Sequence, residues 1–203
     1  MFARTLYLVR HGAYLPDDKS DSQPGPGLSP LGIAQARLVA ARLRSLPVNF
    51  DSMTTSTMTR ARETSAVMHE TLRNLPLTQS HLLAECAPPA WATLKDETLA
   101  EQLACARRLD QVFAERFKRA EKREAHEIVV AHGNVIRYLV TKALGADTRA
   151  WLGMSVAHAS LTVIQARADG SMKVLTVGDS GHIPASLLSW GTDSDPQLEV
   201  PSY

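Results

Sequence analysis

The 203-residue sequence has few cysteines, few aromatic residues and almost no net charge. Its two cysteines, Cys86 and Cys105, are too few for a disulfide scaffold and lack metal-ligand spacing, so we expect two small buried thiols. No stretch approaches the roughly 18 consecutive apolar residues that a membrane span needs. A net charge of +1 leaves no basic excess for binding nucleic acid through its phosphates. We therefore expect that the protein binds neither membranes nor nucleic acid.

The first apolar run is short and lies close to the first residue. Residues 6–9 (LYLV) are too few for the apolar part of a secretory signal, and no small-residue cleavage site follows them. The run is instead typical of a buried first strand. We therefore expect a cytoplasmic protein, in a compartment that keeps cysteines reduced.

Apolar runs of strand length alternate with stretches of helical periodicity. Strands are expected at residues 6–9, 50–55 and 127–131, and helices over residues 30–41, 58–72, 99–117 and 135–144. Segments 161–166 and 173–177 flank Asp169-Gly170, which is typical of a hairpin. This order predicts an α/β fold with three αβα layers and a mainly parallel sheet carrying one antiparallel edge strand.

The length favours one domain over residues 1–203. The polar loop over residues 13–28 is longer than most connections, and such loops are often lids or substrate loops. Residues 192–203 are polar and contain prolines, so we expect a loose or docked tail. An exposed edge strand would also allow a homodimer.

Two histidines directly follow expected strands. Arg10-His11-Gly12 comes after the first strand, and His132-Gly133-Asn134 follows the strand at 127–131. Ligands of open α/β sheets bind outside the carboxyl ends of the strands, so neighbouring strands would bring both imidazoles to one pocket. Either histidine alone is more often a core or turn residue, and an Arg-His-Gly tripeptide is a weak motif by itself.

Four blocks of sequence, in this order, carry a more specific signal. They are residues 8–12 (LVRHG), residues 28–32 (LSPLG) with Gln35-Ala36, residues 56–61 (STMTRA) with Glu63-Thr64, and residues 130–137 (VAHGNVIR). The series resembles the histidine phosphatase superfamily, which has the phosphoglycerate mutase-like fold. Within it, residues 56–61 and 132–138, Trp151-Leu152 and Gly178-Asp179 make the chain most similar to the phosphoglycerate mutase-like serine/threonine protein phosphatases known from mitochondria.

The resemblance implies phosphoryl transfer to a histidine. His11 would attack phosphorus with one ring nitrogen while the other donates to a backbone carbonyl, giving a phosphohistidine. Arg10, Arg60 and His132 would bind the oxygens of the dianionic phosphomonoester, since guanidinium groups can form two parallel hydrogen bonds to it. This chemistry requires no metal and no cofactor, and the histidines show no zinc-ligand spacing.

Two further residues are candidates for the site. In families with this pattern, a carboxyl group on the segment after the Arg60 helix protonates the leaving group and then activates water, and Glu85 is the matching position. A glutamate before a proline-rich stretch is otherwise commonly a surface residue. His158 precedes a strand where relatives often have a pocket asparagine, so it is a candidate pocket residue, with a turn residue as the alternative.

The enzymatic interpretation leaves the substrate open between phosphoserine or phosphothreonine in proteins and a small phosphorylated metabolite. A mutase is less favoured because 203 residues leave little room for an insertion that closes over phosphoglycerate. Glu85 argues against a phosphohistidine phosphatase, whose phosphoramidate substrate needs no acid. The intact set Arg10, His11, Arg60 and His132 argues against a non-catalytic scaffold that only binds phosphorylated partners.

Overall fold

The structure is a computed structural model that describes residues 1–15, 24–92, 94 and 97–191. Its strands are β1 (Arg4–Arg10), β2 (Ser52–Ser56), β3 (Leu77–Ser80), β4 (Ala125–Ala131), β5 (Leu161–Ala166) and β6 (Met172–Asp179). Its helices are α1 (Pro30–Arg44), α2 (Thr59–Thr71), α3 (Leu99–Arg116) and α4 (Gly133–Ala143), with short 3-10 helices η1 (His81–Leu83), η2 (Thr148–Gly153) and η3 (Ala185–Leu187). The expected tail at 192–203 and the middle of the 13–28 loop lie outside the described residues.

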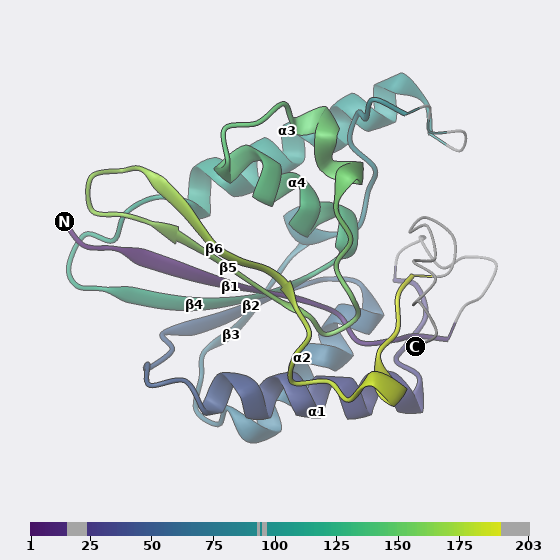
Figure 1. Cartoon of the computed structure of the whole chain (residues 1–203), viewed down its shortest axis with the longest axis vertical. Helices are drawn as coiled ribbons and strands as arrows, with labels where there is room; N and C mark the ends of the chain where they lie inside the picture. The colour runs from purple at the N-terminus through teal and green to yellow at the C-terminus, as the bar shows by residue number, and fades with distance from the viewer. Residues whose placement is uncertain (16–23, 93, 95–96, 192–203) are drawn as a thin grey trace, which may run out of the picture.

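The strands form one mixed sheet in the order β3-β2-β4-β1-β5-β6 (Figure 1). Neighbours among β3, β2, β4 and β1 are parallel, whereas β5 is antiparallel to both β1 and β6. The α/β fold class is thus confirmed. The antiparallel strand is β5, which lies one position in from the edge and not at the edge itself. The tight hairpin through Gly170 (φ +90°) turns the chain back after β5, so that β6 becomes the edge strand.

Helices cover the sheet on both faces, α3 and α4 on one and α1 and α2 on the other (Figure 1). The side chains of β1 alternate between these two layers. Leu6 and Leu8 belong to the core beneath α3 and α4, while Tyr7 and Val9 belong to the core against α1 and α2. Because a central parallel strand is buried on both faces, its sequence is a nearly continuous apolar run.

The two cysteines form a disulfide, so the expectation of two separate thiols is wrong. Their Cα atoms are 5.9 Å apart although 19 positions separate them in sequence. The segment after η1 packs along α3, which brings Cys86 within disulfide reach of Cys105. This proximity arises from tertiary packing, and the sequence spacing gave no sign of it.

A close backbone approach fixes the chain just after β1. Ser29 caps α1 by accepting a hydrogen bond from the amide of Gly32 at 3.1 Å, and its own amide donates to the carbonyl of Ala13. A Cβ at Gly32 would lie 1.9 Å from the carbonyl oxygen of Ala13, and one at Gly12 would lie 2.5 Å from the carbonyl oxygen of Gly32. The first turn of α1 can therefore approach the chain after β1 this closely only because residues 12 and 32 are glycines.

We predict that Gly32→Ala lowers the free energy of unfolding by about 1–3 kcal/mol, because the new methyl group would force this backbone contact apart. Urea denaturation followed by circular dichroism measures the change. Gly153→Ala is the matched control, since a Cβ there meets no atom within 4 Å among the described residues, and its effect should stay within about 0.5 kcal/mol. Equal effects of the two substitutions would contradict the packing argument.

Candidate active site

His11 lies at the carboxyl end of β1 and is fixed through both ring nitrogens. Nδ1 lies 2.8 Å from the carbonyl oxygen of Gly12, an acceptor, so Nδ1 carries the proton. Nε2 then has a free lone pair, which accepts a hydrogen bond from Nε of Arg60 at 3.1 Å. The side chain is 2% exposed. This is the tautomer that a nucleophilic Nε2 requires, and it agrees with the backbone hydrogen bond expected from the sequence.

His132 lies beside His11 because their strands are neighbours. β1 and β4 are parallel, and Arg10 is paired with Ala131 in the ladder. The next residues therefore leave the sheet together, and the two imidazole centroids are 5.0 Å apart. Nε2 of His132 lies 2.8 Å from the hydroxyl oxygen of Ser56, which ends β2. Three adjacent strand ends thus contribute to one site.

The two arginines enter the site from different elements. Arg10 is the last residue of β1, and its Nη1 donates to the carbonyl of Val156 at 2.6 Å. Arg60 is the second residue of α2 and is 1% exposed, with its guanidinium 5.0 Å from the ring centroid of Tyr14. Gly133 opens α4 directly behind Arg10, where a Cβ would lie 3.5 Å from the guanidinium carbon. Helix N-termini favour anions, so α2 and α4 add to the positive potential of this site.

Burial and neighbouring positive charges keep the pocket histidines neutral. Burial lowers the pKa of His11 well below its ordinary value, and His132, Arg60, Arg10 and His158 lower it further. Burial likewise lowers the pKa of His132, with smaller contributions from Arg60, Arg10 and Arg108. The neutral imidazole, with its free lone pair, is the form of histidine that can act as a nucleophile.

The predicted acid, Glu85, lies on the irregular segment that follows η1. Its amide donates to Sδ of Met58 at 3.2 Å, and Met58 occupies the N-cap position of α2, two residues before Arg60. The carboxylate Oε1 accepts a hydrogen bond from the amide of Cys86. Burial lowers the pKa of Arg108 and the charge of Glu85 raises it, while the charge of Arg108 contributes to the lowered pKa of His132.

His158 joins the same cluster from the turn before β5. Its ring centroid is 5.5 Å from that of His11 and 5.9 Å from that of Tyr14. Nδ1 lies 2.9 Å from Oγ of Ser189, while the buried Nε2 has no hydrogen-bond partner among the described residues. Burial, with Arg10 and Arg60, lowers the pKa of His158 to about 2.

Sequence reasoning missed several residues that hold this cluster. Gln35 accepts from the amide of Ala13 and donates to Oγ of Ser189, so it joins the chain after His11 to the residue that holds His158. Gln35 and Ser56 both stand in the sequence blocks described above, which was an available signal. Tyr14 and Ser189 carried none, because only the fold brings them to the pocket.

Comparison with known proteins identifies the family of the chain. The model of the histidine phosphatase superfamily (branch 1) matches residues 6–108 and 103–179. The chain belongs to the histidine phosphatase superfamily. Histidine phosphatases act on phosphorylated substrates, and the expectation of a phosphatase enzyme is confirmed at this level.

Curated relatives of this histidine phosphatase are named mitochondrial serine/threonine-protein phosphatases Pgam5. The protein from Caenorhabditis elegans is 36% identical over 201 residues, which cover 92% of this chain and 66% of the relative. The protein from Xenopus laevis is 34% identical over 193 residues, covering 92% of this chain and 69% of the relative. The chain thus spans about two thirds of the length of these relatives. The cytoplasmic location expected from the sequence is contradicted by these mitochondrial names.

Solved structures show the same fold at lower identity. A phosphoglycerate mutase from Bacillus anthracis has a TM-score of 0.69 at 20% identity and covers 89% of this chain and 95% of that chain. A putative alpha-ribazole-5'-P phosphatase from Escherichia coli has a TM-score of 0.68 at 19% identity, covering 87% of this chain and 96% of that chain. The phosphoglycerate mutase-like fold expected from the sequence is confirmed.

The described residues contain neither a metal-ligand cluster nor a membrane-spanning helix. In that part of the chain, no three side chains among His, Cys, Asp and Glu are grouped so that they could hold a metal ion. No helix within it has both the length and the apolar character to cross a membrane.

We predict that stability falls as the pH decreases below about 6.5, where the unfolded chain protonates histidines that the folded pocket keeps neutral. The pKa values of His11, His132 and His158 are lowered in the folded protein. The contribution of these neutral histidines to the free energy of unfolding is therefore complete above pH 7 and is lost toward lower pH. Each of these histidines should lower the free energy of unfolding by about 1.4 kcal/mol as the pH falls from 7.5 to 5.5. Urea denaturation in phosphate-free buffer measures this.

The variant His158→Asn isolates one of these contributions. Its unfolding free energy should depend less on pH than that of the wild type, by about 1.4 kcal/mol over the same interval. An unchanged dependence would show that His158 is not held neutral in the folded protein.

Proposed function

We propose that this histidine phosphatase hydrolyses phosphomonoesters through a phosphohistidine on Nε2 of His11, with no metal ion. The observation that carries the proposal is the orientation of His11, whose Nδ1 is held on the carbonyl of Gly12 while Nε2 faces the guanidinium of Arg60. When a phosphoryl group occupies the site, Arg60 transfers its hydrogen bond from the imidazole to a phosphoryl oxygen. The nitrogen lone pair is then free to attack phosphorus in line with the leaving oxygen.

The transfer divides into two displacements of similar chemistry. In the first, the N–P bond forms as the P–O bond to the leaving group breaks, and Glu85 gives its proton to the leaving oxygen. In the second, Glu85 takes a proton from water, the hydroxide attacks phosphorus and the N–P bond breaks to release phosphate and neutral His11. Arg10, Arg60 and His132 bind the equatorial oxygens throughout, and this positioned charge supplies the largest catalytic effect. We assign His158 to the wall of the same pocket.

We further propose phosphoserine and phosphothreonine in proteins as the substrates. The support is the identity of 34–36% to relatives that are named serine/threonine-protein phosphatases. Residues 1–203 are proposed to act as one domain, supported by the single sheet that joins strands from Arg4 to Asp179. A homodimer through the edge strand β6 stays a prediction, supported by the exposed side chains of Leu175 and Val177 on that strand.

The direct test is hydrolysis of 4-nitrophenyl phosphate by the purified chain in the presence of a chelator. We expect turnover that survives chelation and falls by at least a thousandfold in His11→Ala, because no other group replaces the nucleophile. Rapid acid-free quenching with labelled substrate should trap the label on His11 in the wild type. Phosphate binding without turnover would instead indicate a non-catalytic scaffold, and a screen of phosphopeptides against phosphorylated metabolites decides the substrate class.

Glu85→Gln should affect substrates according to their leaving groups. We predict a loss of about a hundredfold or more with alkyl phosphates, whose alkoxide needs a proton, and a much smaller loss in the first displacement with aryl phosphates. Burst kinetics separate that displacement from hydrolysis of the phosphoenzyme. Equal losses for both substrate types in the first displacement would remove Glu85 from the acid role.

A further inference from the structure

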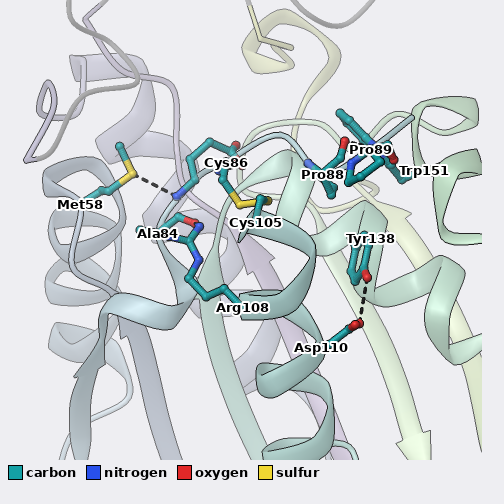
Figure 2. Close-up of a disulfide and its surroundings, with 11 residues drawn as sticks. Met58, Ala84, Cys86, Pro88, Pro89, Cys105, Arg108, Asp110, Tyr138 and Trp151 are labelled. Carbon is teal, nitrogen blue, oxygen red and sulfur yellow. Dashed lines mark hydrogen bonds between the residues drawn. A yellow bond between two sulfur atoms is a disulfide. The ribbon is translucent and has the colours of Figure 1, made fainter. Parts of the chain in front are cut away.

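The residues on either side of Glu85 are both tied to helix α3. The carbonyl of Ala84 accepts a hydrogen bond from Nη2 of Arg108 at 2.6 Å, and Cys86 is joined to Cys105 by the disulfide. Figure 2 shows Arg108 reaching Ala84 and Cys105 reaching Cys86 from this one helix. Cys105 and Arg108 are three positions apart and so share a face of α3.

A third contact joins this segment to the phosphate site. The amide of Glu85 donates to Sδ of Met58, drawn as a dashed line in Figure 2, and Met58 is the N-cap residue of α2, the helix that carries Arg60. Residues 84–92 form neither helix nor strand. Their position therefore depends on side-chain contacts of this kind, and two of the three described here come from α3.

We propose that Arg108 and the Cys86–Cys105 disulfide are positioning elements that hold Glu85 for proton transfer, so that reduction of the disulfide slows the turnover of substrates with poor leaving groups. This inference rests on the proposed role of Glu85. The groups proposed to bind the phosphoryl group are Arg10, His11, Arg60 and His132, which lie at strand ends and at a helix N-terminus. Neither cysteine belongs to these elements, so we expect this part of the site to stay in place when the disulfide opens.

The reductant is a dithiol. Its thiolate attacks one sulfur of the disulfide and forms a mixed disulfide, and its second thiol then displaces the protein sulfur. Two electrons pass from the dithiol to the protein, which gains two cysteine thiols while the dithiol becomes a cyclic disulfide. Cys86 and Cys105 line a surface cavity of about 280 Å³ together with Glu97, Glu101, Ala104 and Arg108, so a small dithiol can reach the bond.

The test compares alkyl and aryl phosphates with the double variant Cys86→Ala/Cys105→Ala and with wild-type protein reduced by dithiothreitol. We expect the first displacement to slow about tenfold with the alkyl phosphate and less than twofold with 4-nitrophenyl phosphate. Arg108→Met should show the same selectivity, whereas Arg107→Ala, an exposed neighbour on α3, should leave both rates unchanged. In the Glu85→Gln background, removal of the disulfide should cause no further loss. Equal loss with both substrates, or no loss, overturns the inference.

Hydrogen exchange supplies a readout that does not depend on activity. The amides of Glu85 and Cys86 donate to Met58 and to the Glu85 carboxylate, so they should exchange faster when the disulfide is opened, while amides of β1 and β4 keep their protection. Unchanged exchange at these two amides overturns the inference. A wild-type chain that hydrolyses neither substrate would end the proposed function, and the exchange result would still decide whether the disulfide holds this segment.

Discussion

The hydrogen bond between the His11 ring and the carbonyl of Gly12 is the constraint on which the site depends. It decides which ring nitrogen has the free lone pair and which direction that lone pair faces. The bond requires a defined path for the chain just after β1. The amide of Gly12 donates to Oγ1 of Thr64, and the amide of Ala13 donates to Gln35. Helices α1 and α2 therefore fix the backbone that in turn fixes the imidazole.

Collecting this many cationic and basic groups in a buried site opposes folding. Arg10 and Arg60 are almost fully buried, and His11, His132 and His158 lie among them. The imidazoles stay neutral because protonation would add charge to a buried site that already holds two guanidinium groups. A dianionic phosphoryl group relieves this repulsion, so substrate should stabilise the folded chain by mass action. The positive groups that oppose folding are those that we propose to stabilise charge on the transferred phosphoryl group.

Local signals were sufficient for the central part of the site. The parallel strands at residues 4–10 and 125–131 are apolar runs that end in Arg10-His11 and His132, and the Ser29-Pro30 cap of α1 is a property of neighbouring residues. Strand β3 (LTQS) could not be found in this way, because it is short, its side chains are mostly exposed and its sequence has no apolar alternation. The disulfide and the contact of His158 with Ser189 join residues 19 and 31 positions apart, and only packing brings such pairs together.

The site is built in two parts that differ in rigidity. Ladder hydrogen bonds fix the groups that we propose to bind the phosphoryl oxygens, since Arg10, His11 and His132 all stand at or just after strand ends. Glu85 instead lies on irregular backbone, held by Met58 and by groups on α3. Under the proposed mechanism, a change in that second part would alter proton transfer to the leaving group and would leave phosphoryl binding intact. For this reason the dependence of rate on the leaving group, and not the overall rate, reports how the acid is held.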